Sequence, residues 1–181
     1  MCIRDRRSIV DECITIIGSK LKLHTISCDI PDDLMVYVTR SQLSQILINL
    51  ISNARDATQE KYDQHAILDY HPWIQIMGEE TTRSGHRGTV ISVEDNGGGI
   101  SADNADKVFE AFFTTKAVGV GTGLGLSIIK RLVANHDGDI EVGGSSLGGA
   151  KFEIFLPHPK INEHAINHPD PVKPAAASKI A

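Results

Sequence analysis

The sequence has little of what marks membrane, disulfide-rich or nucleic-acid-binding proteins. Its longest apolar run near the N-terminus covers residues 13–17, far too short to span a bilayer, and nothing resembles a signal peptide. The three cysteines form no CxxC pair, which argues against a disulfide framework or a zinc site and favours a reducing compartment. A net charge of −5 leaves no basic excess for nucleic acid. We expect a cytoplasmic domain that binds no nucleic acid; a membrane anchor elsewhere in the parent protein stays open.

Three common nucleotide-binding motifs are also missing. The P-loop requires GxxxxGK[ST], and no glycine here is followed by Lys-Ser or Lys-Thr. The dinucleotide fingerprint GxGxxG is absent because the glycines of residues 119–125 recur at every second position, so the third glycine is misplaced. The HRD and DFG signatures of protein kinases are missing as well.

What the chain does contain is an alternation of helix and strand patterns. The clearest helix covers residues 41–59, where an apolar stripe with three- and four-residue spacing borders a polar stripe that includes Asn49 and Asn53. Helices are also expected at residues 8–24 and 123–135, and a loop at 60–72. Strands are expected at residues 25–30, 36–38, 73–78, 89–95, 139–143 and 151–156. This order predicts an α/β sandwich with helices on one face of a mixed sheet.

An acidic residue ends the expected strand at 89–95. The two-residue period of a strand places Ile91, Val93 and Asp95 on one face. If the two apolar side chains face the core, Asp95 points inward, and a buried carboxylate requires a donor such as an adenine exocyclic amine. The alternative is a turn aspartate in Asp-Asn-Gly-Gly, which this segment alone favours.

Two glycine clusters and one asparagine add to this pattern. Residues 97–99 allow a close backbone approach. Residues 119–126 lead into a helix whose free amides suit a polyphosphate, and Lys116 adds a positive charge nearby. The alternative is a surface loop. Asn53 offers an oxygen ligand of the kind that magnesium prefers, the alternative being an ordinary helix-surface asparagine.

Taken together and in order, these segments resemble the ATP-binding domain of sensor histidine kinases. This domain belongs to the GHKL, or Bergerat-fold, superfamily, which also includes type II topoisomerases, ninety-kilodalton heat-shock chaperones and mismatch-repair ATPases. The resemblance rests on an N box at residues 49–57, a first glycine box at 95–100, an F box at 108–116, a second glycine box at 121–127 and a closing strand at 149–157. It covers roughly residues 21–158. It implies a two-layer α/β (α+β) sandwich with a mixed, mostly antiparallel sheet covered on one face by helices.

The resemblance also implies roles for individual residues, with ATP and Mg²⁺ as cofactors. Asp95 would bind the adenine amine, Asn53 would ligate magnesium, and Lys116 would hold phosphates. Residues 103–122 would form a mobile ATP lid docked by two phenylalanines. The catalytic positions implied are Asn49, Asn53 and Lys116. The cofactor-binding positions implied are Asn53, Ala57, Asp95, Gly97, Gly99, Ile100, Phe112, Phe113, Thr115, Lys116, Gly121, Thr122, Gly123, Leu124, Gly125 and Leu126.

One position separates the branches of this superfamily. Members that hydrolyse ATP carry a glutamate as general base four residues before the magnesium asparagine, and this chain has Asn49 there. An amide cannot take a proton from water near neutral pH, whereas a histidine nucleophile already has a lone pair. The resemblance therefore favours a histidine kinase. The chain departs from the family pattern at three places. Ala150 lies near the position of a usual threonine, and the loop at 60–72 is longer than usual. Just after the N-box asparagine, where many members have a cation, this chain has Arg55 and then Asp56.

The resemblance divides the chain into three parts. Residues 1–20 are expected to be a truncated linker or the end of an upstream helical dimerisation domain, residues 21–158 the ATP-binding domain, and residues 159–181 a disordered tail. The opening MCIRDR looks like a truncated start, the alternative being a native charged N-terminus.

The expected activity is phosphoryl transfer from Mg-ATP to a histidine on a helical dimerisation (phosphoacceptor) domain, in two-component signalling. None of the eight histidines has the expected His-Glu context, so the phosphoacceptor would lie on another domain. The implied partners are that domain and a response-regulator receiver domain, within a homodimeric parent. The alternatives are a self-sufficient ATPase of the same fold, a non-catalytic nucleotide-binding regulatory module, and a serine-kinase regulator of sigma factors.

Overall fold

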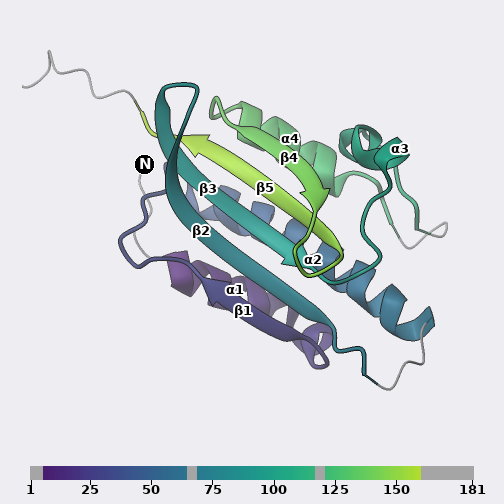
Figure 1. Cartoon of the computed structure of the whole chain (residues 1–181). Coiled ribbons are helices and arrows are strands. Elements are labelled where there is room, and N and C mark those ends of the chain that lie inside the picture. The colour runs from purple at the N-terminus through teal and green to yellow at the C-terminus, as the bar shows by residue number, and fades with distance from the viewer. Residues whose placement is uncertain (1–5, 65–68, 117–120, 160–181) are drawn as a thin grey trace, which may run out of the picture.

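In the residues that the structure describes, five strands and three longer helices form the domain (Figure 1). The computed structural model describes residues 6–64, 69–116 and 121–159. The strands are β1 (Thr25–Asp29), β2 (Trp73–Arg83), β3 (His86–Asp95), β4 (Asp139–Gly144) and β5 (Ala150–Pro157). The helices are α1 (Arg6–Ile17), α2 (Arg40–Gln64), α3 (Ala102–Ala105) and α4 (Gly125–Ala134), with 3-10 turns η1 (Gly18–Leu21) and η2 (Lys107–Phe109).

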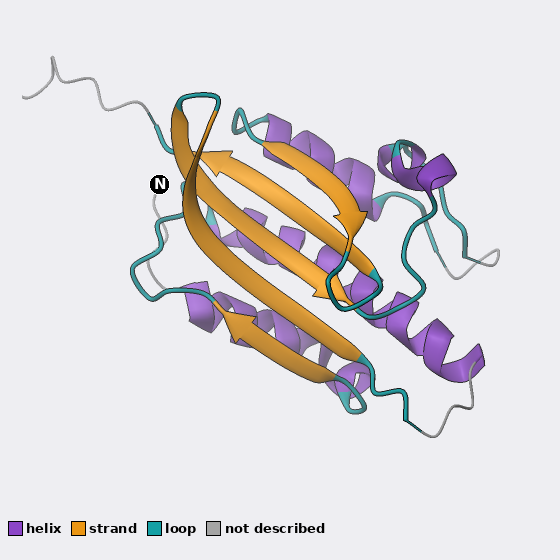
Figure 2. Ribbon diagram, viewed as in Figure 1, coloured by secondary structure: helices purple, strands orange, loops and turns teal. Residues whose placement is uncertain are grey.

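The strands make a single mixed sheet in the order β1-β2-β3-β5-β4. β1 runs parallel to β2, and every other neighbouring pair is antiparallel. Helices α1, α2 and α4 cover one face of the sheet, so the molecule has two layers (Figure 2). The predicted two-layer sandwich with a mixed, mostly antiparallel sheet is confirmed.

The core lies between the two layers because each element turns its apolar stripe toward the other. In α2, Leu43, Leu47 and Leu50 are at most 1% exposed, and they recur at the spacing of one helix face. Across from them, the inward-facing residues of the central strands include Ile74 and Ile154, both fully buried. Burial of these side chains holds α2 against β2 and β3.

Several boundaries differ from those expected. Helix α2 continues beyond residue 59 to Gln64, so the predicted loop at 60–72 starts later. Bonds between side chains four residues apart support these extra turns, from Gln59 to Asp63 and from Gln64 to Glu60. The strands at 73–78 and 89–95 are longer than predicted, because the hairpin pairs them up to Arg83 and His86.

The predicted strand at residues 36–38 is wrong. Val36 forms only an isolated bridge, and the segment does not join the sheet. Its valines alternate inward because they fill the core: Val36 is fully buried and Val38 is 1% exposed. Alternating apolar residues therefore marked a loop that packs on the core, which a two-residue period cannot distinguish from a strand.

Helix α1 belongs to the core of this domain, although residues 1–20 were expected to be a linker or part of another domain. Ile9, Val10 and Cys13 are fully buried in the same cluster as the α2 leucines. Cys13 donates to the carbonyl of Ser44 at 3.7 Å, and Arg40 pairs with Glu12 at 2.7 Å. The packed core therefore begins before residue 21.

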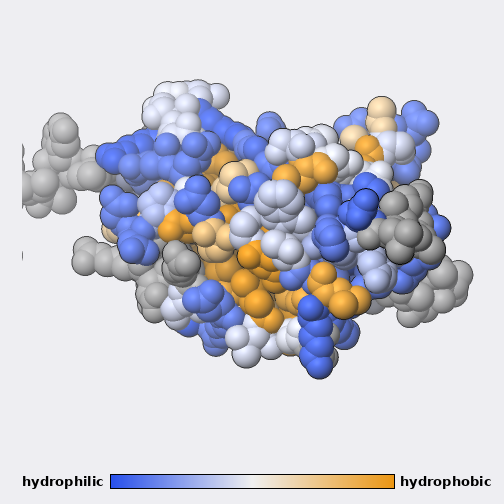
Figure 3. All heavy atoms as spheres, turned by 60° about the horizontal axis from the view of Figure 1, so that its bottom comes forward, coloured by the Kyte–Doolittle hydropathy of each residue, from blue (hydrophilic) through white to orange (hydrophobic). Residues whose placement is uncertain are grey.

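The side of the molecule formed by α1 and β1 carries apolar surface. Figure 3 brings this side forward and shows hydrophobic atoms gathered among hydrophilic ones. Ile16 and Leu23 are each 62% exposed.

No helix in the described part of the chain is both long enough and apolar enough to cross a membrane. The expected tail lies outside the described residues from 160 onward.

Candidate functional site

A cavity of about 690 Å³ opens between α2, the end of β3, the F box and the start of α4. Most of the predicted nucleotide-binding residues line it, which brings together boxes that are far apart in the sequence. These residues are Asn49, Asn53, Ala57, Asp95, Gly97, Gly99, Ile100, Phe113, Thr115, Lys116, Gly121, Thr122, Gly123, Gly125 and Leu126. Phe112 and Leu124 are not among the lining residues.

Asp95 contributes a buried carboxyl group to the wall of this cavity. It is the last residue of β3, where pairing with Ile74 points its side chain to the helix-covered face, and it is 2% exposed. The amides of Gly97 and Ala150 donate to Oδ1 at 2.8 and 3.2 Å, and neither bond uses Oδ2. Burial raises the pKa of Asp95, although the two backbone bonds and the charge of Lys61 act in the opposite direction.

Three residues of α2 face the cavity from successive turns. Asn49, Asn53 and Ala57 are four residues apart, so they lie on one side of the helix. Gly97 packs directly on the last of them: a Cβ added to Gly97 would lie 2.8 Å from the carbonyl carbon of Ala57 and 2.9 Å from its Cβ. The polar stripe of α2 is thereby held against the first glycine box.

This contact leads to a test with a matched pair of glycines. We expect Gly97→Ala to lower the free energy of unfolding by about 1–3 kcal/mol, because the new methyl group overpacks against the α2 backbone. Gly98→Ala is the control, since a Cβ there meets nothing within 4 Å. Chemical denaturation of both variants measures the difference. Equal stability of the two variants would contradict the packing described here.

The second glycine box meets the F box through backbone contacts. The amide of Phe112 donates to the carbonyl of Gly123 at 2.9 Å, and a Cβ on Gly123 would lie 2.4 Å from the carbonyl carbon of Phe112. Gly123 also has a φ of +64°, which favours glycine. The ring of Phe112 is 74% exposed, so the docking expected of it is not made in this structure. Phe109 packs inward instead, edge-on to Phe152 with ring centroids 6.3 Å apart.

Helix α4 begins at the cavity. Gly123 lines the wall just before α4, and Gly125 and Leu126 line it in the first turn, where backbone amides have no partner within the helix. Asn49 of α2 lies nearby, 3.7 Å from the position of a Cβ on Gly125. This end of the cavity therefore offers free amides and the positive end of a helix dipole.

A local charge network reaches the cavity through Lys116. Lys116 forms an ion pair with Asp56, which also pairs with Arg55. The sequence pattern placed Lys116 on phosphates, whereas here its ammonium group is held by a carboxylate. An anionic ligand must therefore compete with Asp56 for Lys116.

Comparison with known proteins identifies the family. Residues 38–160 match the family described as histidine kinase-, DNA gyrase B- and HSP90-like ATPases. The chain belongs to this family. The cavity lies within the matched residues, since its lining runs from Asn49 to Phe152.

Relatives within the family are named as sensor kinases. The two-component sensor PprA of Pseudomonas aeruginosa is 34% identical over 159 residues, which cover 84% of this chain and 16% of PprA. The sensor histidine kinase ZraS of Escherichia coli K12 is 37% identical over 116 residues, covering 64% of this chain and 22% of ZraS. The chain thus spans less than a quarter of either relative.

The fold is likewise similar to that of solved histidine kinase domains. The catalytic domain of histidine kinase ThkA superimposes with a TM-score of 0.70 at 27% identity, covering 87% of this chain and 94% of that domain. The full-length structure of ShkA in complex with AMPPNP gives a TM-score of 0.64 at 26% identity, covering 84% of this chain and 30% of ShkA.

Sequence reasoning missed Lys61 of α2, which lines the cavity. Lys61 donates to the carbonyls of Asn96 and Gly97 at 2.8 and 3.1 Å, so it fixes the turn after Asp95. Tyr70 donates to Asn96 Oδ1 at 3.0 Å, and burial together with the charge of Asp95 raises the pKa of Tyr70 to about 12. Extending the polar stripe of α2 past residue 59 would have found Lys61.

Other lining residues were not among the predicted site residues, although several of them lie within the predicted boxes. They are Ser52, Glu60, Gln64, Gly98, Ser101, Asn104, Val108, Thr114, Gly148, Ala150 and Phe152. Within residues 6–64, 69–116 and 121–159, no group of three or more His, Cys, Asp or Glu side chains is placed to hold a metal ion.

Proposed function

We propose that this domain binds Mg-ATP and passes the γ-phosphoryl group to a histidine on a helical dimerisation domain. The single observation that carries the proposal is the buried Asp95 carboxylate at the wall of a cavity of about 690 Å³. Pockets of this size suit a nucleotide, and Oδ2 of this carboxylate, which neither backbone bond uses, can accept a hydrogen bond from a ligand. Membership of an ATPase family and similarity to named histidine kinases support the same conclusion.

The purine end of the cavity fits adenine. Asp95 Oδ1 already accepts two backbone bonds, so Oδ2 is the oxygen left to accept from an exocyclic amine. A Cβ on Gly97 or Gly149 would lie within 3 Å of neighbouring backbone atoms, so the walls beside the carboxylate are backbone. Backbone walls leave room for a flat base and fix its orientation.

The other end of the cavity fits a metal-bound triphosphate. Asn53 provides an amide oxygen, Lys116 a cation, and the first turn of α4 free amides. Bound magnesium would neutralise phosphate charge during transfer. The residues of this chain would bind and orient the triphosphate, and Lys116 would release Asp56 to reach it.

Asn49 distinguishes kinase from ATPase. It lies on the cavity wall near the first turn of α4, and its amide cannot deprotonate water near neutral pH. An imidazole nucleophile needs no such base because it carries a lone pair. The site is thus better suited to transfer to histidine than to hydrolysis.

The partners follow from the proposed reaction. A phosphohistidine formed on a helical dimerisation domain would pass its phosphoryl group to the receiver domain of a response regulator, within a homodimeric parent protein. Similarity to the two-component sensor PprA over 84% of this chain supports this assignment.

A transfer assay tests the function. The domain is mixed with radiolabelled Mg-ATP and a separately produced helical domain that carries the His-Glu segment of a sensor kinase. We expect labelled phosphohistidine to form, and calorimetry to detect bound ATP. Tight binding without transfer would support a regulatory module, and steady ATP hydrolysis that depends on Asn49 would support an ATPase. Absence of ATP binding by folded protein would refute the proposal.

A further inference from the structure

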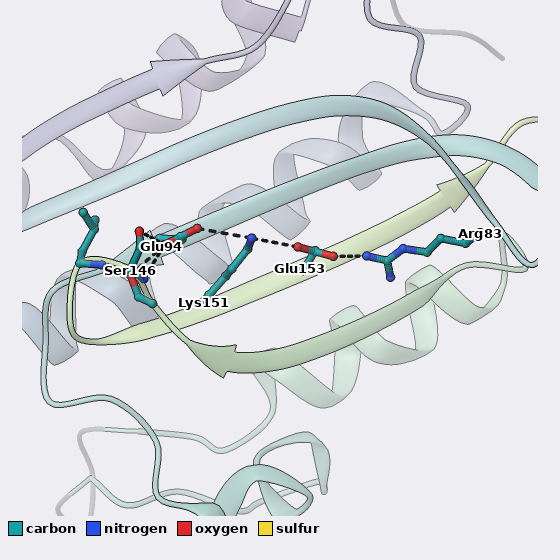
Figure 4. Close-up of polar contacts among 7 residues, drawn as sticks. Arg83, Glu94, Ser146, Lys151 and Glu153 are labelled. Atoms are coloured by element: carbon teal, nitrogen blue, oxygen red, sulfur yellow. Dashed lines mark hydrogen bonds and ion pairs between the residues drawn. The ribbon is translucent and has the colours of Figure 1, made fainter.

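We propose that Glu94 is a positioning residue of the nucleotide site, which acts from the opposite face of the sheet by holding the turn at residues 145–149. The inference rests on the proposed function, because the turn shapes the wall beside Asp95. Figure 4 shows the polar contacts that carry the argument.

Glu94 and Asp95 are neighbours in β3 that point to opposite faces of the sheet. Asp95 points to the cavity, and Glu94 points to the face that the helices leave open. Glu94 is nevertheless buried, with a side chain that is 4% exposed. Something other than a helix must therefore cover it.

The turn between β4 and β5 covers Glu94. Its Oε2 accepts bonds from the hydroxyl and amide of Ser146, both at 3.1 Å, and from the hydroxyl of Ser145 at 2.9 Å. Lys151 reaches its other oxygen at 3.4 Å. Burial by itself would raise the pKa of Glu94, but the serine bonds and the charge of Lys151 bring it below its ordinary value. A charged carboxylate thus receives three donors from one turn.

Gly149 of this turn and Ala150, the first residue of β5, also bond to Asp95. The amide of Gly149 donates to the Asp95 carbonyl at 3.1 Å, and the amide of Ala150 donates to Asp95 Oδ1 at 3.2 Å. The amide of Ser145 donates to the carbonyl of Gly149 at 2.9 Å, so the part of the turn held by Glu94 is bonded to the part that contacts Asp95. Gly148 and Ala150 both line the cavity.

The end of β3 is therefore bonded on both faces of the sheet, at Glu94 by the turn and at the Asp95 side chain by Ala150, which follows the turn. Ala150 has no side-chain donor, so its contact with the Asp95 carboxylate depends on where its backbone lies. Glu94 determines that placement through the serines. A shift of the turn would leave Asp95 Oδ1 without one of its two donors and change the direction in which Oδ2 faces.

A matched control lies on the same face of the sheet. Glu153 of β5 also contacts Lys151, at 3.0 Å, and pairs with Arg83, but the bonds described for it do not involve the turn (Figure 4). Glu153→Gln removes a comparable charge from the same ladder of ion pairs. The change in binding caused by Glu153→Gln therefore measures the loss of these ion pairs without a change in the turn.

The experiment uses two ligands in calorimetry with magnesium: ATP, and purine riboside triphosphate, which lacks the exocyclic amine. The variants are Glu94→Gln, the double variant Ser145→Ala/Ser146→Ala, and Glu153→Gln. We expect the first two to weaken ATP binding by about tenfold while changing the affinity for purine riboside triphosphate little, because they disturb the orientation of Asp95. Glu153→Gln should keep the wild-type preference for ATP.

The outcomes separate this inference from the proposed function. If the wild type binds neither ligand, the proposed function fails, and the inference fails with it. If the wild type binds ATP but the turn variants keep its full preference for ATP, Glu94 has no positioning role. Equal loss of both ligands would reduce Glu94 to a structural residue. Should Glu94→Gln not fold, the double serine variant decides, since it removes turn donors and leaves the carboxylate in place.

Discussion

Asp95→Asn is expected to weaken ATP binding by about 100-fold or more while leaving the free domain at least as stable as the wild type. An asparagine oxygen can still accept the backbone bonds from Gly97 and Ala150, so the end of β3 keeps its geometry. The amide nitrogen then occupies the place of Oδ2 and presents a donor to the adenine amine, which is itself a donor. Isothermal calorimetry and thermal denaturation measure the two effects.

The difference in stability between this variant and the wild type is expected to depend on pH, because only the wild type has a titrating group at residue 95. Burial raises the pKa of Asp95 above its ordinary value of 3.8, so the folded protein holds the proton more tightly than the unfolded chain does. Its stabilising contribution is complete below pH 3.8 and is lost as the pH rises through the raised folded value. The stability of Asp95→Asn relative to the wild type is therefore expected to increase from acidic to neutral pH. A variant that is less stable at pH 7 and still binds ATP would contradict the role of Asp95.

Asn53→Ala is expected to slow phosphoryl transfer to a supplied helical domain by about 100-fold, because it removes the amide oxygen proposed as a magnesium ligand. The affinity for ATP in the absence of magnesium should change little. Transfer rates at saturating Mg-ATP, and ATP titrations with and without EDTA, measure the two quantities.

The same helix provides the control for this prediction. Gln45 lies on the polar stripe of α2, two turns before Asn53, but it is exposed and does not line the cavity. Gln45→Ala should transfer at the wild-type rate. If Asn53→Ala also transferred normally, or lost ATP affinity equally without magnesium, Asn53 would not act through the metal.

Local patterns predicted most elements of the fold because the core is built from regular stripes. The apolar stripe of residues 43–54 and the alternation in residues 89–95 each lie in one continuous segment, and both appear as expected. Both failures occur where contacts other than a regular apolar stripe decide the structure. Val36 and Val38 alternate without joining a strand, and α2 extends through polar residues whose support comes from i,i+4 bonds and contacts with the turn after β3.

The candidate site was predictable where residue type and position in a box carry the chemistry. Asp95, Asn53 and the glycines of the two glycine boxes all reach the cavity wall. Lys116 also reaches it, but its ion pair with Asp56 depends on how the F box lies against α2, which no local period describes. The position of the Phe112 ring was not predictable from local patterns either, since it faces solvent in this structure.

The sequence by itself determined the family, the helix-covered mixed sheet, and the carboxylate and asparagine that line the cavity, because these depend on short-range periodicity and on the order of the boxes. Only the tertiary structure decided what surrounds them. Glu94 looks like an ordinary outward-facing strand residue until the pairing of β4 and β5 beside β3 brings the turn at residues 145–149 over it. Contacts of this kind join residues about fifty positions apart, and the strand order that creates them is a property of the whole sheet.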